Sequence, residues 1–487
     1  MKGITRATKI VATLGPATDS PQKIEQLIGA GVDVVRLNFS HGTAKEHIQR
    51  ASWVHEAAHR LERDVGVMVD LQGPKIRIGK FENGQIDLVA GAKFILDLDC
   101  KLGNQNRVGL DYRQLIDDVS DKDILLLNDG HIVLQVESIV KKEIFCKVVQ
   151  GGSLSDKKGI NRQGGGLSAP ALTDKDIEDI SVAASIEADY VAVSFPKSAN
   201  DIFRARQLLI KASSKAWVIA KIERVEAIRN LNEILDASHG LMVARGDLAT
   251  EVGEAAVPAL QKRMIQLARD KNKLAITATQ MMESMTQSPV PTRAEVSDVA
   301  NAVLDGTDAV MLSAETAAGK YPARTVSKMS EICLEAEKFV EGIVDSHFLD
   351  RTFQSIDQSI AMASLFVALH LKIKAIASFT QSGSTALWIS RLNSGVPIYA
   401  MTPEDSTRRR MSLYRDVQPI FLPQEQNDRE ELIRIAEQKL VDAKIVTQGD
   451  LIVVTIGEPL GQSGGTNTMK IVEISAKPLD DLEQLRF

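Results

Sequence analysis

The 487 residues are enough for about three domains, and 44% hydrophobic with 25% charged residues is typical of globular proteins, which excludes a disordered chain. The formal charge of −6 argues against a nucleic-acid-binding protein. The cysteines are scattered and no apolar run approaches the roughly 18 residues of a membrane span. We therefore expect a cytoplasmic protein without a nucleic-acid or membrane partner.

Short apolar runs alternate with helical patterns in two parts of the chain. Strands are predicted at 9–14, 32–37, 65–70, 190–195, 217–223, 240–247, 274–279 and 308–313. Helical patterns lie between them, for example at 45–62, 200–212 and 257–271. Eight strands that each precede a helix predict an α/β fold of the (β/α)8 barrel type, formed by residues 1–73 and 170–344. An open doubly wound sheet is the alternative.

Two other segments do not follow this pattern. Residues 74–169 contain short strand-like runs separated by turn signals such as Asn128-Asp-Gly130, which predicts a small all-β domain inserted into the barrel. Residues 345–487 again alternate helices with strands, which predicts a separate C-terminal α/β domain.

Polar residues gather where the predicted barrel strands end, and this end of a barrel carries the active site. Lys221 and Glu223 share one face of their strand because side chains alternate. Asp247 ends the next strand, so the two carboxylates can converge on Mg²⁺. For Lys221 and Glu223 alone, a surface ion pair is the simpler interpretation. Ser194 ends the preceding strand, and no role follows for it from the sequence.

Cations suited to phosphate accompany these carboxylates. Arg36 can fork onto a phosphate, Lys221 can neutralise a transferring phosphoryl group, and a helix that starts after Gly246-Asp247 can bind an anion. A Schiff-base aldolase would also use a barrel lysine, but Glu223 favours the charged form of Lys221. Lys75 should lie beside Asn38 and Ser40, where its ammonium could replace a monovalent cation; a solvated loop lysine is the alternative.

These motifs resemble the pyruvate kinase family over the whole length of the barrel. The matching segments are RLNFSHG (36–42), DLQGPKIR (70–77), IAKIE (219–223), VARGDL (243–248), ATQM (278–281), PTRAE (291–295) and DAVMLSAET (308–316). The order of barrel, β insertion and C-terminal α/β domain matches as well. The resemblance implies a homotetramer that transfers the phosphoryl group of phosphoenolpyruvate to ADP, giving pyruvate and ATP, with Mg²⁺ or Mn²⁺ as cofactor.

The resemblance also implies roles for individual residues. The metal ligands would be Glu223 and Asp247, and Lys221 would stabilise the transferring group while Arg36 contacts the phosphate. Thr279 would lie beside the enolate carbon, and backbone groups of Arg245, Gly246 and Asp247 would bind the substrate carboxylate. The nucleotide would be lined by Asn38, His41, Arg77 and Lys175. The inserted β domain would close as a lid that excludes water.

Two departures from the family pattern concern ions and effectors. Many members bind K⁺ through positions that correspond here to Asn38, Ser40, Asp70 and Leu71. Leu71 has no side-chain oxygen, and Lys75 stands where K⁺-dependent members carry glutamate. We therefore predict an enzyme that does not require K⁺.

The second departure lies in a predicted effector loop ahead of a helix, made of Thr380, Ser382, Gly383, Ser384 and Thr385. Ser384 replaces an arginine of many bacterial members, and the turn Gly461–Thr466 is expected to close over the loop. A sugar phosphate or nucleotide is the predicted effector, and an ordinary helix cap is the alternative. For the whole chain, the alternatives are another barrel enzyme acting on phosphoenolpyruvate or pyruvate, and a non-catalytic phosphometabolite sensor.

Overall fold

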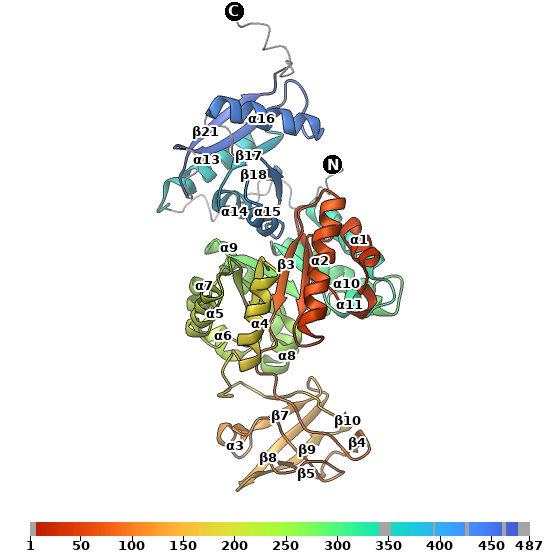
Figure 1. Ribbon diagram of the computed structural model, residues 1–487. Coiled ribbons are helices and arrows are strands. Elements are labelled where there is room, and N and C mark those ends of the chain that lie inside the picture. Colours follow the sequence, from red (N-terminus) through yellow and green to blue (C-terminus); the bar gives the residue numbers. More distant parts are fainter. Residues whose placement is uncertain (1–5, 340–351, 393–394, 424–427, 460–463, 476–487) are drawn as a thin grey trace, which may run out of the picture. The chain divides into compact units, whose positions relative to one another are not determined.

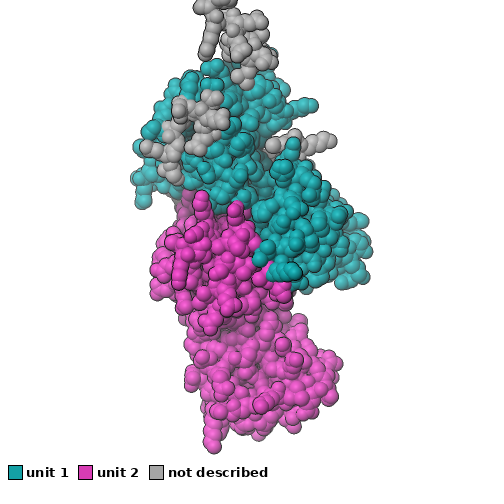
Figure 2. All heavy atoms as spheres, in the orientation of Figure 1, with its two compact units in different colours: residues 1–37, 45–68, 281–487 teal, residues 38–44, 69–280 magenta. Residues whose placement is uncertain are grey.

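The computed structural model describes residues 6–339, 352–392, 395–423, 428–459 and 464–475. The chain divides into two compact units, one of residues 1–37, 45–68 and 281–487 and the other of residues 38–44 and 69–280 (Figure 2). The predicted border between residues 344 and 345 falls outside the described residues. The borders of the inserted domain at 74 and 169 stay a prediction.

Eight parallel strands form a closed barrel, so the predicted (β/α)8 fold is confirmed and the open sheet is wrong. Around the barrel the order is β1-β16-β15-β14-β13-β12-β3-β2. The strands are β1 (Lys9–Thr13), β2 (Val34–Asn38), β3 (Gly66–Asp70), β12 (Tyr190–Val193), β13 (Trp217–Ile222), β14 (Gly240–Ala244), β15 (Leu274–Ala278) and β16 (Ala309–Leu312). Nearly all of their residues are buried, which explains why the runs are continuously apolar.

Helices follow the strands, and several begin at sequence signals. Ser20 caps α1 with Pro21 in its first turn, and the capping boxes Thr173/Asp176 and Thr292/Glu295 start α4 and α10. The helices of this part are α1 (Pro21–Ala30), α2 (Ala44–Arg60), α4 (Asp174–Ser185), α5 (Ala199–Lys211), α6 (Val225–Arg229), α7 (Leu231–Ala237), α8 (Arg245–Val252), α9 (Val257–Asp270), α10 (Arg293–Leu304), α11 (Ala314–Ala317) and α12 (Pro322–Glu337). Among the described helices, none has the length and apolar character needed to cross a membrane.

The inserted segment forms two sheets around an apolar core (Figure 1). One pairs β4 (Gln85–Leu88) with β10 (Gly152–Ser155). The other has the order β11 (Ile160–Arg162), β7 (Ile124–Leu127), β8 (Ile132–Val140), β9 (Glu143–Gln150), β5 (Lys93–Asp97) and β6 (Arg107–Val108), and a short helix α3 (Leu115–Asp118) precedes β7. Asn128, Asp129 and Gly130 all have positive φ, as the predicted turn requires.

The C-terminal part is a five-stranded sheet with helices. Its order is β19 (Val417–Phe421), β18 (Ile398–Thr402), β17 (Ala375–Phe379), β20 (Leu451–Gly457) and β21 (Thr466–Glu473), and only the β20–β21 pair is antiparallel. The helices are α13 (Ile356–His370), α14 (Ser384–Arg391), α15 (Asp405–Met411) and α16 (Arg429–Asp442).

A buried ion pair joins this sheet domain to the barrel residues of the same unit. Arg391, at the end of α14, binds both carboxylate oxygens of Asp308, and the Nη1–Oδ2 distance is 2.8 Å. Asp308 immediately precedes β16 and also accepts the backbone N–H of Arg415 at 3.1 Å. The side chains of Arg391 and Asp308 are 2% and 0% exposed. Removing either partner would leave a buried charge without its ionic partner, so the pair helps to fix how these two parts pack.

Candidate active site

Lys221 near the end of β13 lies in a cluster of acceptors drawn from three neighbouring strands. Its Nζ is 2.9 Å from Glu223 Oε1 and 3.2 Å from Asp70 Oδ1, and it donates to Ser194 Oγ at 2.7 Å. Lys221 and Glu223 thus share a face, as strand alternation predicts. They do form the ion pair that was the simpler interpretation, but their side chains are only 12% and 1% exposed, so it is not a surface pair.

Glu223 follows β13 directly and is buried. Its Oε2 accepts the backbone N–H of Phe195 at 2.8 Å. Burial raises the pKa of this carboxyl, the Lys221 ammonium opposes that effect, and the negative charge of Asp247 raises the pKa further. The two carboxylates are therefore close enough to repel each other, which is the condition under which a shared cation stabilises both.

Asp247 lies in the first turn of α8, where its negative charge suits the positive end of the helix. We expected this helix to start after Asp247, and that expectation is wrong: α8 begins at Arg245 because the chain passes from β14 into the helix without a loop. The backbone N–H groups of Arg245, Gly246 and Asp247 thus belong to its first turn.

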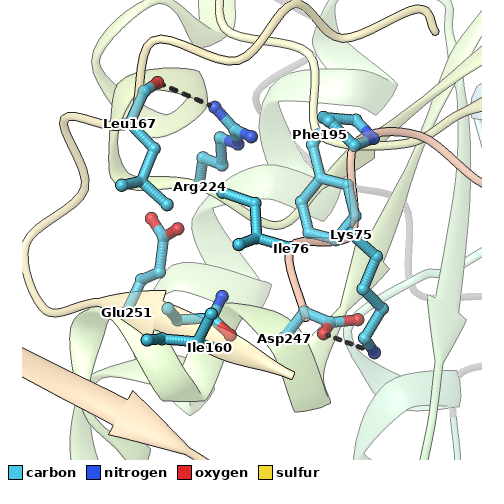
Figure 3. Close-up of a pocket in the computed structure, with 10 residues that line it drawn as sticks. Lys75, Ile76, Ile160, Leu167, Phe195, Arg224, Asp247 and Glu251 are labelled. Carbon is cyan, nitrogen blue, oxygen red and sulfur yellow. Dashed lines mark hydrogen bonds and ion pairs between the residues drawn. The ribbon is translucent and has the colours of Figure 1, made fainter. Parts of the chain in front are cut away.

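Lys75 pairs with Asp247, and the distance from Nζ to Oδ1 is 3.6 Å (Figure 3). Both side chains are about one-third exposed, at 32% and 28%. We had placed Lys75 beside Asn38 and Ser40; those two residues contact each other, with Ser40 N–H donating to Asn38 Oδ1 at 3.1 Å. The pair gives Lys75 a partner on the barrel, so Lys75 is more than a solvated loop lysine.

Thr279 ties the ends of β14 and β15 together. Its Oγ1 accepts the backbone N–H of Gly246 at 3.0 Å, and its carbonyl accepts the Arg245 guanidinium at 2.6 Å. The φ of Thr279 is +70°, an outlying value for a β-branched residue. Such strain persists only where the surroundings hold it, and it is common at functional sites.

The predicted nucleotide residues lie on several elements of the second unit. Asn38 ends β2, and Lys175 on α4 donates to the carbonyl of Phe39 at 2.9 Å and pairs with Asp179. Arg77 lies at the start of the inserted segment, where its Nη1 donates to Lys157 O at 3.0 Å. His41 lies in the loop between β2 and α2. Lys175 thus contacts Phe39, the residue that follows Asn38 in the chain.

Arg36 belongs to the other unit. It lies on β2 with 9% of its surface exposed, and its Nη1 donates to Thr13 Oγ1 at 3.0 Å. Thr13 ends β1, so within this unit the ends of two neighbouring strands fix the guanidinium.

A cleft beside Asp247 is lined by two charged residues, Arg224 and Glu251, that the sequence analysis does not single out (Figure 3). Arg224 is 3% exposed, donates to Leu167 O at 3.3 Å and lies 5.4 Å from the ring centre of Phe195. Glu251 accepts the Val225 N–H at 2.9 Å. The spacing of four residues from Asp247 on a helix was a signal for Glu251. The cleft is lined by Pro74, Lys75, Ile76, Ile160, Asn161, Leu167, Phe195, Arg224, Asp247 and Glu251.

The predicted effector loop turns tightly into α14. Gly383 has φ +86° and its N–H donates to Thr380 Oγ1 at 2.9 Å, while Ser382 Oγ donates to Ser384 Oγ at 3.2 Å. Thr385 Oγ1 lies 2.6 Å from Thr466 Oγ1, the last residue of the turn expected to close over the loop. Residues 461–463 of that turn are outside the described residues.

The burial of Glu251 leads to a prediction about how the stability of the protein depends on pH. Burial raises the pKa of this carboxyl to about 7, from 4.5 when it is unperturbed. The folded protein holds this proton more tightly, so the contribution to stability is complete below about pH 4.5 and is lost as pH rises through about 7. Glu251→Gln keeps the acceptor for Val225 and cannot ionise. Between pH 5 and 8 the free energy of unfolding of the wild type should fall further than that of the variant. We expect the two falls, measured by urea denaturation, to differ by about 1–3 kcal/mol.

Glu25→Gln is the control, because the Glu25 side chain on α1 is 39% exposed and pairs with Arg60. A Glu251→Gln protein whose stability falls with pH as steeply as that of the wild type would contradict the prediction.

Comparisons with known proteins agree with this architecture. Residues 5–326 match the family model described as pyruvate kinase, barrel domain, and residues 358–472 match pyruvate kinase, alpha/beta domain. The chain is 51% identical over 476 residues to a pyruvate kinase of Buchnera aphidicola subsp. Schizaphis graminum, with 96% of this chain and 99% of the relative covered.

Two more relatives extend the likeness. Pyruvate kinase II of Salmonella typhimurium is 48% identical over 475 residues, with 96% and 99% of the chains covered. The crystal structure of a pyruvate kinase from Cryptosporidium parvum superposes with a TM-score of 0.90 at 34% identity, covering 96% of each chain. The chain therefore belongs to the pyruvate kinase family of phosphotransferases.

Proposed function

We propose that this protein transfers the phosphoryl group of phosphoenolpyruvate to ADP, giving pyruvate and ATP. The observation that carries the proposal is the Lys221 ammonium, held beside Asp70, Ser194 and Glu223 at the ends of barrel strands. The P–O bond to the enolate oxygen breaks, a bond to an ADP phosphate oxygen forms, and the enolate carbon takes up a proton. A fixed cation at this place stabilises charge on the phosphoryl group as it moves.

Glu223 and Asp247 suit a hard divalent cation such as Mg²⁺ or Mn²⁺. Burial is the main cause of the raised pKa of Glu223, and the negative charge of Asp247 adds to it. Each carboxylate has an ammonium partner, Lys221 or Lys75. Within the described residues no group of three or more His, Cys, Asp or Glu side chains could hold a metal ion. Two carboxylates with substrate and water oxygens are the usual Mg²⁺ set. Once bound, the ion would neutralise charge on the substrate oxygens.

The remaining residues bind and orient the substrates in this proposal. Arg36 contacts the phosphate, and the first turn of α8, with the N–H groups of Arg245, Gly246 and Asp247, receives the carboxylate of the substrate. Thr279 lies beside the carbon that is protonated; since a hydroxyl is a poor acid, it would act through water. The nucleotide contacts Asn38, His41, Arg77 and Lys175, and the inserted domain closes over the site.

The alternatives explain less of the chain. A different barrel enzyme acting on phosphoenolpyruvate or pyruvate would need neither the inserted domain nor a nucleotide site. A phosphometabolite sensor would not need Lys221, Glu223 and Asp247 together. A Schiff-base aldolase conflicts with the two carboxylates beside Lys221, which favour its charged form.

K⁺ is not required in this proposal. Leu71 offers only a backbone carbonyl, and that carbonyl accepts the Ser194 hydroxyl at 2.7 Å. Lys75 provides a positive charge beside Asp247 instead. A fixed ammonium can take over the electrostatic part of the role of a monovalent cation.

Regulation and assembly belong to the C-terminal domain. Hydroxyl groups and backbone N–H groups of residues 380–385 face one another ahead of α14, which suits the phosphate of a sugar phosphate or nucleotide. Apolar side chains on and next to α13, including Ile356 and Phe366, are 66% and 59% exposed. A homotetramer would cover such a surface. A cytoplasmic location stays a prediction.

The first prediction from the proposed function concerns catalysis. Lys221→Ala should lower the turnover of phosphoenolpyruvate and ADP about 100- to 1000-fold, with affinity for phosphoenolpyruvate largely kept, because the cation acts mainly in the transition state. A coupled assay for pyruvate measures turnover. Lys328→Ala on α12 is the control. Unchanged turnover in Lys221→Ala would rule out this role.

The second prediction concerns K⁺. In buffer with tetramethylammonium as the only monovalent cation, we expect the wild type to keep at least half of the turnover that it has with K⁺. Lys75 supplies a fixed charge that does not depend on salt composition. Near-total loss of activity without K⁺ would show that the prediction is wrong.

The third prediction concerns the effector. Sugar phosphates and nucleotide monophosphates, added singly, should include at least one that shifts the saturation curve for phosphoenolpyruvate. Ser382→Asp should abolish that shift and leave the basal curve unchanged, since it puts negative charge where the phosphate binds. If no compound of the panel moves the curve, the loop is only a helix cap.

A further inference from the structure

Ser194, the first residue after β12, is 1% exposed and has two short hydrogen bonds. Its Oγ donates to Leu71 O at 2.7 Å, with Asp70 Oδ1 as a second and more distant acceptor at 3.4 Å, and it accepts from Lys221 Nζ at 2.7 Å. A serine hydroxyl has one proton and two lone pairs. Because Leu71 O and Asp70 Oδ1 can only accept this proton, and the nearer of them is the Leu71 carbonyl, a lone pair of Ser194 must face the ammonium. The direction of this hydroxyl is therefore fixed by the backbone of the neighbouring strand end.

Two carboxylates also lie beside the Lys221 ammonium, and they are not equivalent. Glu223 at 2.9 Å is the carboxylate that we propose as a metal ligand, so it cannot serve the ammonium alone during the reaction. Asp70 is farther away, at 3.2 Å, and supplies charge more than direction. Ser194 gives a shorter contact than either carboxylate and has no other proposed role.

The surroundings of Ser194 leave little room for a substitute. Gly73, where the chain leaves the barrel for the inserted segment, has φ +64°, and a Cβ on it would lie 2.8 Å from the Cβ of Ser194. This close approach closes the serine off from solvent, as its burial confirms. Water therefore cannot easily take the place of the hydroxyl if it is removed.

We propose that Ser194 is a positioning residue for phosphoryl transfer, whose hydroxyl holds the Lys221 ammonium in the orientation from which it faces the transferring group. The lysine side chain is a flexible chain of four methylene groups, so on its own it does not hold the ammonium in one orientation. Ser194 orients it through one hydrogen bond and need not touch the substrate. This inference rests on the proposed function.

The test compares Ser194→Ala with Ser194→Cys and with Ser364→Ala. Ser364 on α13 is also buried, and its hydroxyl donates to Ile360 O at 2.8 Å, so it controls for the loss of a buried hydroxyl. In the pyruvate assay, Ser194→Ala should lower kcat about 10- to 100-fold while the KM for phosphoenolpyruvate changes less than about threefold. Ser194→Cys keeps a weak acceptor of similar size and should fall between Ala and the wild type.

A second measurement does not depend on activity. Each ligand-free protein is acylated briefly with an N-hydroxysuccinimide ester, and labelling of Lys221 relative to Lys328 is read by peptide mass spectrometry. Ser194→Ala should raise the relative labelling rate at least about threefold, because the amine loses a hydrogen bond that holds it within the cluster.

Four outcomes overturn the inference: kcat of Ser194→Ala within twofold of the Ser364→Ala value, a loss that lies entirely in KM, a Cys variant no better than Ala, or unchanged labelling. If the Ala variant does not fold, the Cys variant and the wild type decide by the same measures. A wild type that makes no pyruvate refutes the proposed function, while the labelling result still shows whether Ser194 holds Lys221.

Discussion

A charge removed from water must find a partner, and this constraint shapes both the active-site strands and the packing of the C-terminal domain. Lys221 is almost buried among Asp70, Ser194 and Glu223, and Asp308 is fully buried against Arg391. The first set faces the proposed substrate, and the second is closed on itself. The two sets of charges therefore differ in what they can do. The Arg391–Asp308 pair is closed to ligands, whereas the charges around Lys221 can exchange a protein partner for a ligand.

The barrel follows from the sequence because its strands are buried on both faces and so appear as uninterrupted apolar runs. The same regularity explains why Lys221 and Glu223 could be assigned to one face, since alternation along a strand is independent of tertiary context. Chain order also indicates that Glu223 and Asp247 approach each other, because β13 and β14 pair in parallel with known register.

What the sequence could not supply are contacts made between elements that meet only after folding. The pair of Lys75 with Asp247 did not follow from the sequence, because a long side chain on an irregular segment can reach several neighbours. Its place beside Asn38 and Ser40 stays a prediction. The start of α8 was misplaced because no cap residue marks it; Ala244 precedes the helix without a side-chain cap. The sequence marked Ser194 only as a polar residue at a strand end and gave no signal for Arg224, since a serine or arginine there becomes informative only when its partners are known.

The pair of Lys75 and Asp247 has a consequence for how the site and the inserted domain respond to one another. Lys75 stands on the stem of that domain, and Asp247 stands on a helix of the barrel. Any cation that takes Asp247 competes with the ammonium, so occupancy of the carboxylate and the conformation of the stem are thermodynamically linked. Linkage is reciprocal: a change in the stem that weakens the pair must tighten cation binding by the same factor by which the cation loosens the stem. Under the proposed function, the affinity of Asp247 for a cation and the conformation of the stem are therefore coupled.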